Sequence, residues 1–198
     1  MNKLCLTASL CLFIGSFATA QVINYNNSIR IGIDYISLDA PDDLGIRYGL
    51  RYARHFANDR IVVAGSLGYL SIKNRRQVAN NFYFEGRPRQ RITADLTALY
   101  DILRSTRHAF RLGGGLSVWY RSDEILREAR SVPGQNGQPA GIEIVSEKAN
   151  ETNVGFHLVA EYEYLIGSRT SLGAQVGMAN LDKAGISSFA GINVGYRF

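Results

Sequence analysis

The sequence LGIRYGLRYARHF at residues 44–56 decides the fold. Every second residue from Leu44 to Phe56 is large and apolar except Arg54, and the residues between them are small or basic. Such alternation is typical of a β-strand whose two faces meet different surroundings, and its length exceeds that of most strands in soluble proteins. Arg54 lies near the strand end, where a long side chain can reach an interface with water.

The same alternation recurs seven times, and it predicts an all-β chain. The further segments are 29–35, 61–69, 92–102, 110–120, 154–164, 172–178 and 190–198. Glycine and tyrosine are frequent, whereas the chain has only four prolines. No apolar run after residue 20 approaches the ~20 residues that a membrane-spanning helix needs.

The connections between these eight segments alternate in length. The short ones are 57–60, 104–108 and 167–170, and the others are 38–43, 74–91, 121–151 and 181–187. Short turns in the periplasm and longer loops outside are typical of outer-membrane barrels. We therefore expect an eight-stranded antiparallel, up-and-down transmembrane β-barrel with both ends of the chain on the side of the short turns.

Alternation alone leaves open which face meets lipid, because a soluble lipocalin-like barrel would line its pocket with the apolar set. The polar face is rich in glycine and alanine, which suits a narrow interior, and aromatic residues near the ends of the apolar stripes are suited to interfacial girdles. The polar face also carries five arginines and five carboxylates, which can pair in a filled polar interior. The ten residues of this predicted lumen network are Arg30, Asp34, Arg47, Arg51, Asp95, Asp101, Arg111, Glu161, Glu163 and Arg197.

The first twenty residues have the layout of a secretory signal peptide. Lys3 precedes the mostly apolar residues 4–17, and Ala18-Thr19-Ala20 forms a small-x-small cleavage site. We expect residues 1–20 to be cleaved after Ala20, leaving one barrel domain at residues 21–198.

Removal of this peptide fixes the charge and thiol content of the mature chain. Cys5 and Cys11 both fall in residues 1–20, so no disulfide is expected. Lys3 is the only charged residue removed, which leaves 21 basic and 17 acidic residues and a net charge of +4. An excess of this size does not predict a nucleic-acid partner.

The chain ends on a terminal aromatic residue with apolar residues at alternate positions behind it, namely Val194, Tyr196 and Phe198. This looks like the C-terminal signal that bacterial barrels present to the outer-membrane assembly machinery. With the signal peptide and eight strands, the sequence resembles the small outer-membrane β-barrel superfamily, which includes the OmpA transmembrane domain, OmpX and OmpW families. The resemblance implies a cell outer membrane location in a Gram-negative envelope, with lipid, lipopolysaccharide and that machinery as partners.

Catalytic, cofactor and metal sites are not expected. A serine nucleophile needs an adjacent base, and the chain neighbours of His157, Phe156 and Leu158, offer no such partner. His108 falls in a predicted turn and His55 near a strand end. The mature chain lacks cysteine and paired histidine spacing, so we predict neither a metal site nor a cofactor.

Two long connections are the candidates for contacts with partners. The first, counted from Lys73 to Arg91, carries six basic residues against Glu85, and it is either a solvated loop or a contact for lipopolysaccharide phosphates. Its basic residues are Lys73, Arg75, Arg76, Arg87, Arg89 and Arg91. The 121–151 connection has a turn-rich tip at residues 133–139. We interpret it as a hairpin that extends two strands and could bind a host or surface partner, with a short helix at 124–130 as the alternative.

The leading hypothesis is a non-enzymatic integral outer-membrane barrel with a structural role in the envelope and contacts made by its loops. A small channel or transporter for small solutes is the first alternative. A soluble periplasmic lipocalin-like carrier is the second alternative.

Overall fold

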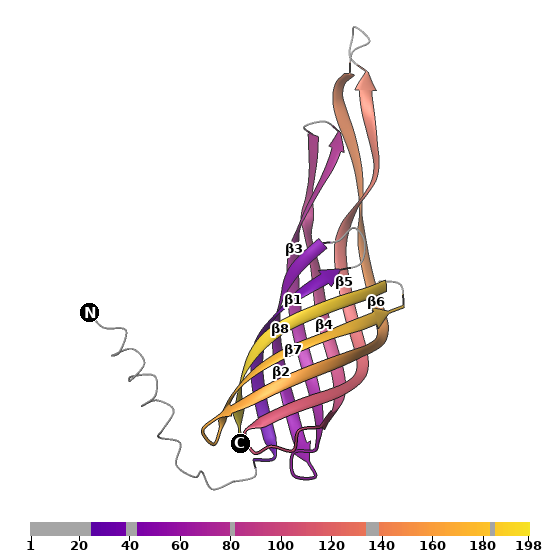
Figure 1. Ribbon diagram of the computed structural model, residues 1–198. Helices are drawn as coiled ribbons and strands as arrows, with labels where there is room; N and C mark the ends of the chain where they lie inside the picture. Colours follow the sequence, from indigo (N-terminus) through magenta and orange to yellow (C-terminus); the bar gives the residue numbers. More distant parts are fainter. Residues whose placement is uncertain (1–24, 39–42, 80–81, 134–138, 183–184) are drawn as a thin grey trace, which may run out of the picture.

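The fold is a closed eight-stranded antiparallel barrel, as predicted. The computed structural model describes residues 25–38, 43–79, 82–133, 139–182 and 185–198, so the predicted signal peptide lies outside the described residues. The strands are β1 Asn27–Leu38, β2 Asp43–Phe56, β3 Ile61–Ala79, β4 Phe82–Asp101, β5 His108–Pro133, β6 Pro139–Ile166, β7 Thr170–Leu181 and β8 Gly185–Arg197. Each strand pairs with its neighbours in sequence, and β1 closes the barrel on β8 (Figure 1).

The two ends of the barrel differ in shape. The links after β2, β4 and β6 form one end, which we call the turn end (Figure 1). Asn27 and Phe198 lie there side by side, joined by two backbone hydrogen bonds. The opposite end, from which the β3–β4 and β5–β6 hairpins extend, is called the hairpin end (Figure 1). No helix among the described residues is long and apolar enough to span a membrane.

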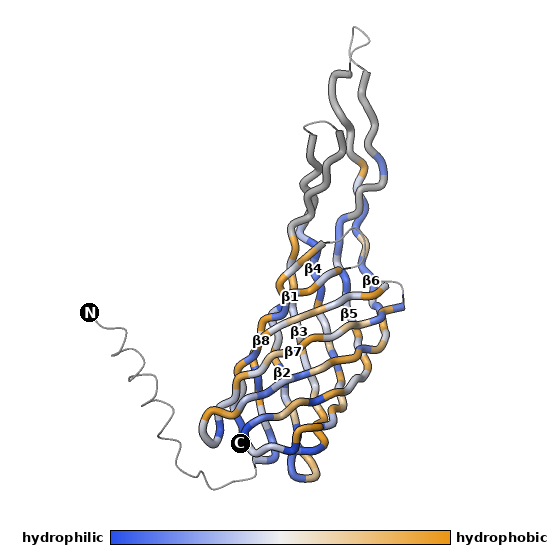
Figure 2. Tube along the Cα trace, in the orientation of Figure 1, coloured by the Kyte–Doolittle hydropathy of each residue, from blue (hydrophilic) through white to orange (hydrophobic). Residues whose placement is uncertain are grey.

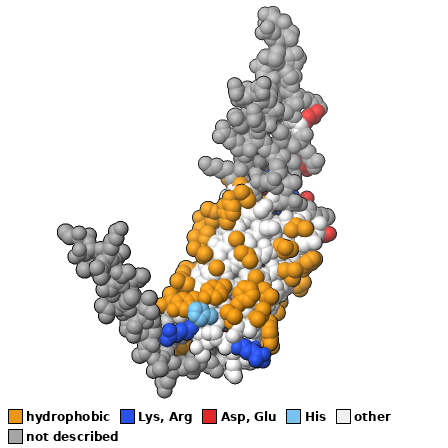
Figure 3. Space-filling model, in the orientation of Figure 1, with side chains coloured by type: hydrophobic (Ala, Val, Ile, Leu, Met, Phe, Trp, Pro, Cys, Tyr) orange, Lys and Arg blue, Asp and Glu red, His pale blue; other side chains and the backbone are white. Residues whose placement is uncertain are grey.

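Hydropathy alternates along the strands (Figure 2), and this alternation becomes an apolar outside and a largely polar inside. Ile31 and Leu116 on the outside are 65% and 63% exposed, whereas Arg30 and Arg111 on the inside are 2% and 0% exposed. Figure 3 shows the apolar side chains gathered over the barrel wall. The prediction that the charged face points inward is therefore confirmed, and this arrangement is the opposite of a lipocalin-like pocket.

The narrow interior depends on glycine where β5 runs beside β4. A Cβ atom at Gly113 would collide with the backbone carbonyl oxygen of Ala98, and one at Gly115 with that of Leu96. Neither carbonyl can move without breaking the β4–β5 ladder. Glycine at these two positions therefore permits the close approach of the strands.

The interior also contains an apolar layer that the sequence analysis did not predict. Trp119, Leu70 and Phe189 are buried together with Ile36 and Leu181 in the half of the barrel nearer the hairpin end. The Arg47 guanidinium lies 4.9 Å from the centre of the Phe189 ring, in cation–π contact. The filled interior therefore combines ionic groups with a tightly packed apolar layer.

Two hairpins extend beyond the closed part of the barrel (Figure 1). Residues 74–79 and 82–91 belong to β3 and β4, so the predicted loop at 74–91 is wrong. Along β5 and β6, pairing continues from His108 with Tyr164 to Pro133 with Pro139. This pairing agrees with the hairpin interpretation of residues 121–151 and excludes a helix at 124–130, because continuous cross-strand hydrogen bonding satisfies the backbone.

The outward apolar face gives a direct test of contact with hydrocarbon. Leu158→Arg, at a position 55% exposed on β6, should lower the free energy of unfolding in lipid vesicles by roughly 2–4 kcal/mol, because an arginine would face the bilayer interior. Urea titration measures this change. The matched control is Asn150→Arg on the same exposed face of β6 above the barrel. An equally small change in both variants would contradict a lipid-facing role for Leu158.

Candidate functional site

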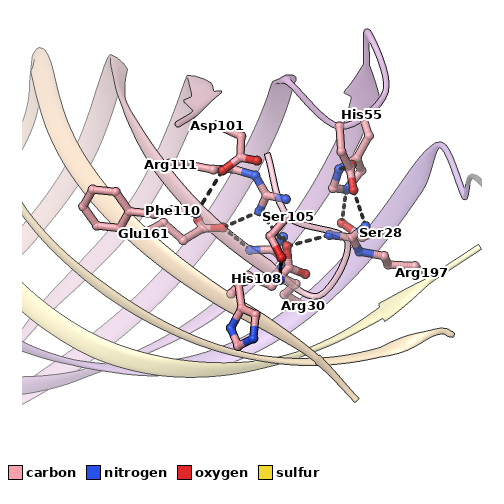
Figure 4. Close-up of polar contacts among 12 residues, drawn as sticks. Ser28, Arg30, His55, Asp101, Ser105, His108, Phe110, Arg111, Glu161 and Arg197 are labelled. Atoms are coloured by element: carbon pink, nitrogen blue, oxygen red, sulfur yellow. Dashed lines mark hydrogen bonds and ion pairs between the residues drawn. The ribbon is translucent and has the colours of Figure 1, made fainter. Parts of the chain in front are cut away.

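The centre of the lumen is an ionic cluster built on two glutamates of β6, Glu161 and Glu163. Glu161 accepts hydrogen bonds from Arg30 and from Arg111 at 3.2 Å (Figure 4). It also accepts one from Arg51 at 2.5 Å. One oxygen of Glu163 lies 3.0 Å from Arg30, 2.6 Å from Arg111 and 2.7 Å from Arg197. We call these six residues the glutamate cluster. It joins five strands, since the arginines come from β1, β2, β5 and β8.

A second, smaller group surrounds Asp34. Arg47 donates two hydrogen bonds to one Asp34 oxygen, at 2.8 and 3.0 Å, and Gln175 donates to the other at 2.6 Å. Asp95 lies 3.5 Å from the Arg47 guanidinium. Asp101 is buried and accepts a hydrogen bond from the backbone N–H of Phe110 at 2.9 Å (Figure 4). The structure thus places all ten predicted network residues on the inner face and divides them between separate groups.

At the turn end, Asp59 enters the interior from the link after β2, which the sequence analysis missed. The His55 ring shares a hydrogen bond of 2.8 Å with the Ser28 hydroxyl through Nε2, and its Nδ1 lies 2.5 Å from Asp59. Arg197 donates to the other Asp59 oxygen. The order serine–histidine–aspartate matches that of a hydrolase triad. Ser28 is fully buried, however, so its hydroxyl has no access to a substrate.

His157 also has partners that its chain neighbours did not reveal. Its Nε2 lies 2.9 Å from the Thr97 hydroxyl and its Nδ1 lies 2.8 Å from the Ser117 hydroxyl. The ring borders an internal cavity of about 60 Å³. Thr93 and Trp119 line the same cavity with buried polar atoms that have no protein partner. Because one water needs roughly 10–15 Å³, the cavity can hold a few waters that satisfy these groups.

Of the six residues predicted to contact lipopolysaccharide, the structure describes the side chains of two, and both are buried. Arg89 and Arg91 are buried at the mouth of the hairpin end, where both pair with Asp123, and Arg121 donates to the same carboxylate at 2.7 Å. These two arginines face inward, so they do not project toward lipid around the barrel. The side chains of Lys73, Arg75, Arg76 and Arg87 lie outside the described residues.

The three residues of the predicted assembly signal lie on the outer face at the end of β8. Val194, Tyr196 and Phe198 are each about half exposed. The Tyr196 hydroxyl accepts a hydrogen bond from Arg169 at 2.9 Å. Their role in assembly stays a prediction. No group of His, Cys, Asp and Glu among the described residues has the arrangement to hold a metal ion.

Solved structures share this architecture at low sequence identity, whereas no family model and no curated protein matches the chain. The N-terminal β-barrel domain of Pseudomonas aeruginosa OprF is 15% identical with a TM-score of 0.54, over 88% of this chain and 100% of that one. Neisserial surface protein A is 12% identical with a TM-score of 0.56, over 87% and 96%. Yersinia pestis Ail, solved with the heparin analogue sucrose octasulfate, is 14% identical with a TM-score of 0.54, over 87% and 96%.

These likenesses define the class of fold, that of a small outer-membrane β-barrel. The barrel fold that the resemblance of the sequence implied is therefore confirmed. At sequence identities of 12–15%, the likeness shows a shared fold alone.

We expect the removal of one charge from the glutamate cluster to lower the stability of the barrel strongly. Glu161→Gln leaves Arg30, Arg51 and Arg111 with one carboxylate fewer in the interior, and it should lower the free energy of unfolding by about 3–5 kcal/mol. Urea titration in vesicles measures the effect. The control Glu151→Gln removes an exposed charge and should change stability by less than about 0.5 kcal/mol. Similar stability of both variants would show that the cluster is not a main support of the barrel.

The interactions of Asp59 at the turn end predict that the stability of the fold depends on pH. Burial alone would raise the pKa of Asp59, but His55 and Arg197 outweigh burial and lower that pKa from 3.8 to about 2. The ionised carboxylate therefore stabilises the fold at neutral pH, and this contribution declines below about pH 4 and is lost below about pH 2. Unfolding of the wild type and Asp59→Asn, compared from pH 5 to pH 2, should show a stability difference that disappears on acidification. A constant difference would rule out this linkage.

Proposed function

We propose that the protein is a non-enzymatic integral outer-membrane barrel that supports the envelope and presents its two hairpins for contacts outside the membrane. The observation that carries this proposal is the division of side chains between the two faces of the wall. Ile31, Leu116 and Ile192 are among the most exposed apolar residues, while the glutamate cluster is shielded inside. An arginine facing lipid costs roughly 2–4 kcal/mol, so a bilayer strongly favours this division.

The hairpins support a role in surface contacts. Pairing between β4 and β5 ends at Gln90 with Ser122, and beyond this point the β3–β4 and β5–β6 hairpins continue separately. Their outer strand edges offer backbone donors and acceptors to an added strand of a host or surface partner. Without the inward-facing Arg89 and Arg91, the segment 73–91 carries four basic residues and Glu85, a net charge of +3, which suits the anionic groups of lipopolysaccharide. Ail, a structural neighbour, was solved with a sulfated heparin analogue.

The cavity beside His157 favours a small channel as the second candidate function. In the described part of the lumen, the glutamate cluster lies toward the turn end of this cavity and the apolar layer lies toward the hairpin end. Conduction of solutes would require both to rearrange. A filled lumen is common in barrels of eight strands, and it favours the structural role over the channel.

Fractionation and surface proteolysis test the proposed function. The protein should fractionate with outer membranes, migrate differently on gels before and after heating, and lose its hairpins to protease added to intact cells. The barrel should survive this cleavage because the hairpins contribute little to its wall. Recovery in the aqueous fraction without detergent would refute the membrane location and favour a soluble carrier. Large, stable conductance steps in planar bilayers would instead favour the channel.

A further inference from the structure

The turn end carries a groove that the lumen network does not use. Its volume is about 290 Å³, and it lies between the start of β1 and the link after β2. Tyr25, Asn26, Arg54, Phe56 and Asn58 line it together with His55, Ala57 and Asp59. Because the carboxylate of Asp59 is engaged by His55 and Arg197, the uncommitted charge at the groove is that of Arg54.

A second arginine, Arg169, is exposed and contacts Tyr25 of the groove lining. It donates hydrogen bonds to the hydroxyls of Tyr25 at 2.7 Å and Tyr196 at 2.9 Å, and its guanidinium lies 5.0 Å from the centre of the Tyr25 ring. Tyr25, a residue of the groove lining, thus connects Arg169 to the groove. On the other side, the Arg54 guanidinium lies 5.5 Å from the centre of the Phe56 ring. Both arginines are held against aromatic rings and keep hydrogen-bond donors available.

The surroundings of the groove are apolar on the side of the barrel wall. Tyr52 and Phe198 contact each other with ring centres 6.5 Å apart, and both are about half exposed on the outer face. Figure 3 shows basic side chains and a histidine at the margin of the apolar surface near the turn end. Basic groups directly beside exposed aromatic residues match the depth at which a bilayer changes from acyl chains to phosphates.

Most of the exposed side-chain charge around the turn end is basic among the described residues. Exposed or half-exposed arginines there are Arg54, Arg60, Arg104, Arg107 and Arg169. Of the carboxylates of this end, Asp101 is buried, and Asp59, which also lines the groove, is paired with His55 and Arg197. Each basic residue near an anionic membrane surface contributes about 1 kcal/mol of attraction to it.

We propose that the groove binds the headgroup of an anionic phospholipid from the leaflet on the turn side. The phosphate would accept hydrogen bonds from Arg54 and Arg169, which offer forked donors. The glycerol part would occupy the groove beside Asn26 and Asn58, and the acyl chains would lie along Tyr52 and Phe198. This inference rests on the membrane location in the proposed function and adds a lipid-specific site to it.

Native mass spectrometry tests the site directly. The folded full-length barrel is taken from nanodiscs that contain equal amounts of phosphatidylglycerol and phosphatidylcholine, and the lipids retained are counted. The wild type should retain phosphatidylglycerol preferentially, and raised salt should weaken this preference. Arg54→Gln and Arg169→Gln should each reduce the retention by about ten-fold, the effect of losing a hydrogen bond to a charged group. Arg54→Lys should retain more of it than Arg54→Gln.

Arg104→Gln is the matched control, because it removes an exposed arginine of the same end outside the groove. It should leave retention of phosphatidylglycerol unchanged. Equal retention of the two lipids by the wild type, or an equal loss in Arg104→Gln and Arg54→Gln, would overturn the site. The wild-type comparison needs no variant to fold. Heat-modifiability reports the barrel separately, so failure of the lipid site is distinguishable from failure of the proposed function.

Discussion

Glu161 and Glu163 neutralise arginines that come from four other strands, and the barrel depends on this neutralisation. A wall with apolar residues outside leaves the inner face for the charged residues in the middle of the strands. Within so narrow a cylinder, an arginine without a carboxylate would carry a desolvation penalty of several kcal/mol. Placing both glutamates on β6, two residues apart, lets their side chains enter from one strand and meet guanidinium groups from around the barrel.

The rest of the interior is organised around that cluster. Toward the turn end, Asp59 extends the ionic contacts through Arg197 and brings the link after β2 against the lumen. This link holds Ala57, Asn58 and Asp59 at positive φ, a conformation that costs free energy in residues other than glycine. Toward the hairpin end, Trp119 and Phe189 fill the cross-section with apolar atoms. Both ends of the lumen are therefore occupied by side chains of the wall itself.

Sequence periodicity predicted the strands and their inner faces, because parity along a strand fixes the direction of each side chain. Arg89 and Arg91 could have been placed by the same rule, since they share the parity of Asp95 on β4. The sequence analysis placed them in the 74–91 connection because it read the alternation only over residues 92–102. Parity gives no register between distant strands, so the partners of His157 and the grouping around Glu161 required the structure. Asp59 was missed because periodicity does not apply to a turn.

Strand length separates the closed barrel from the two hairpins that we propose for contacts with partners. A strand crosses the hydrocarbon layer in about 9–11 residues, yet β5 has 26 residues and β6 has 28. The glutamate cluster and the apolar layer lie within the closed barrel, where they already satisfy the needs of the wall. The additional residues of β5 and β6 pair mainly with each other, so the wall does not require them. Selection for an activity of the protein is therefore expected to act on the hairpins more than on the lumen.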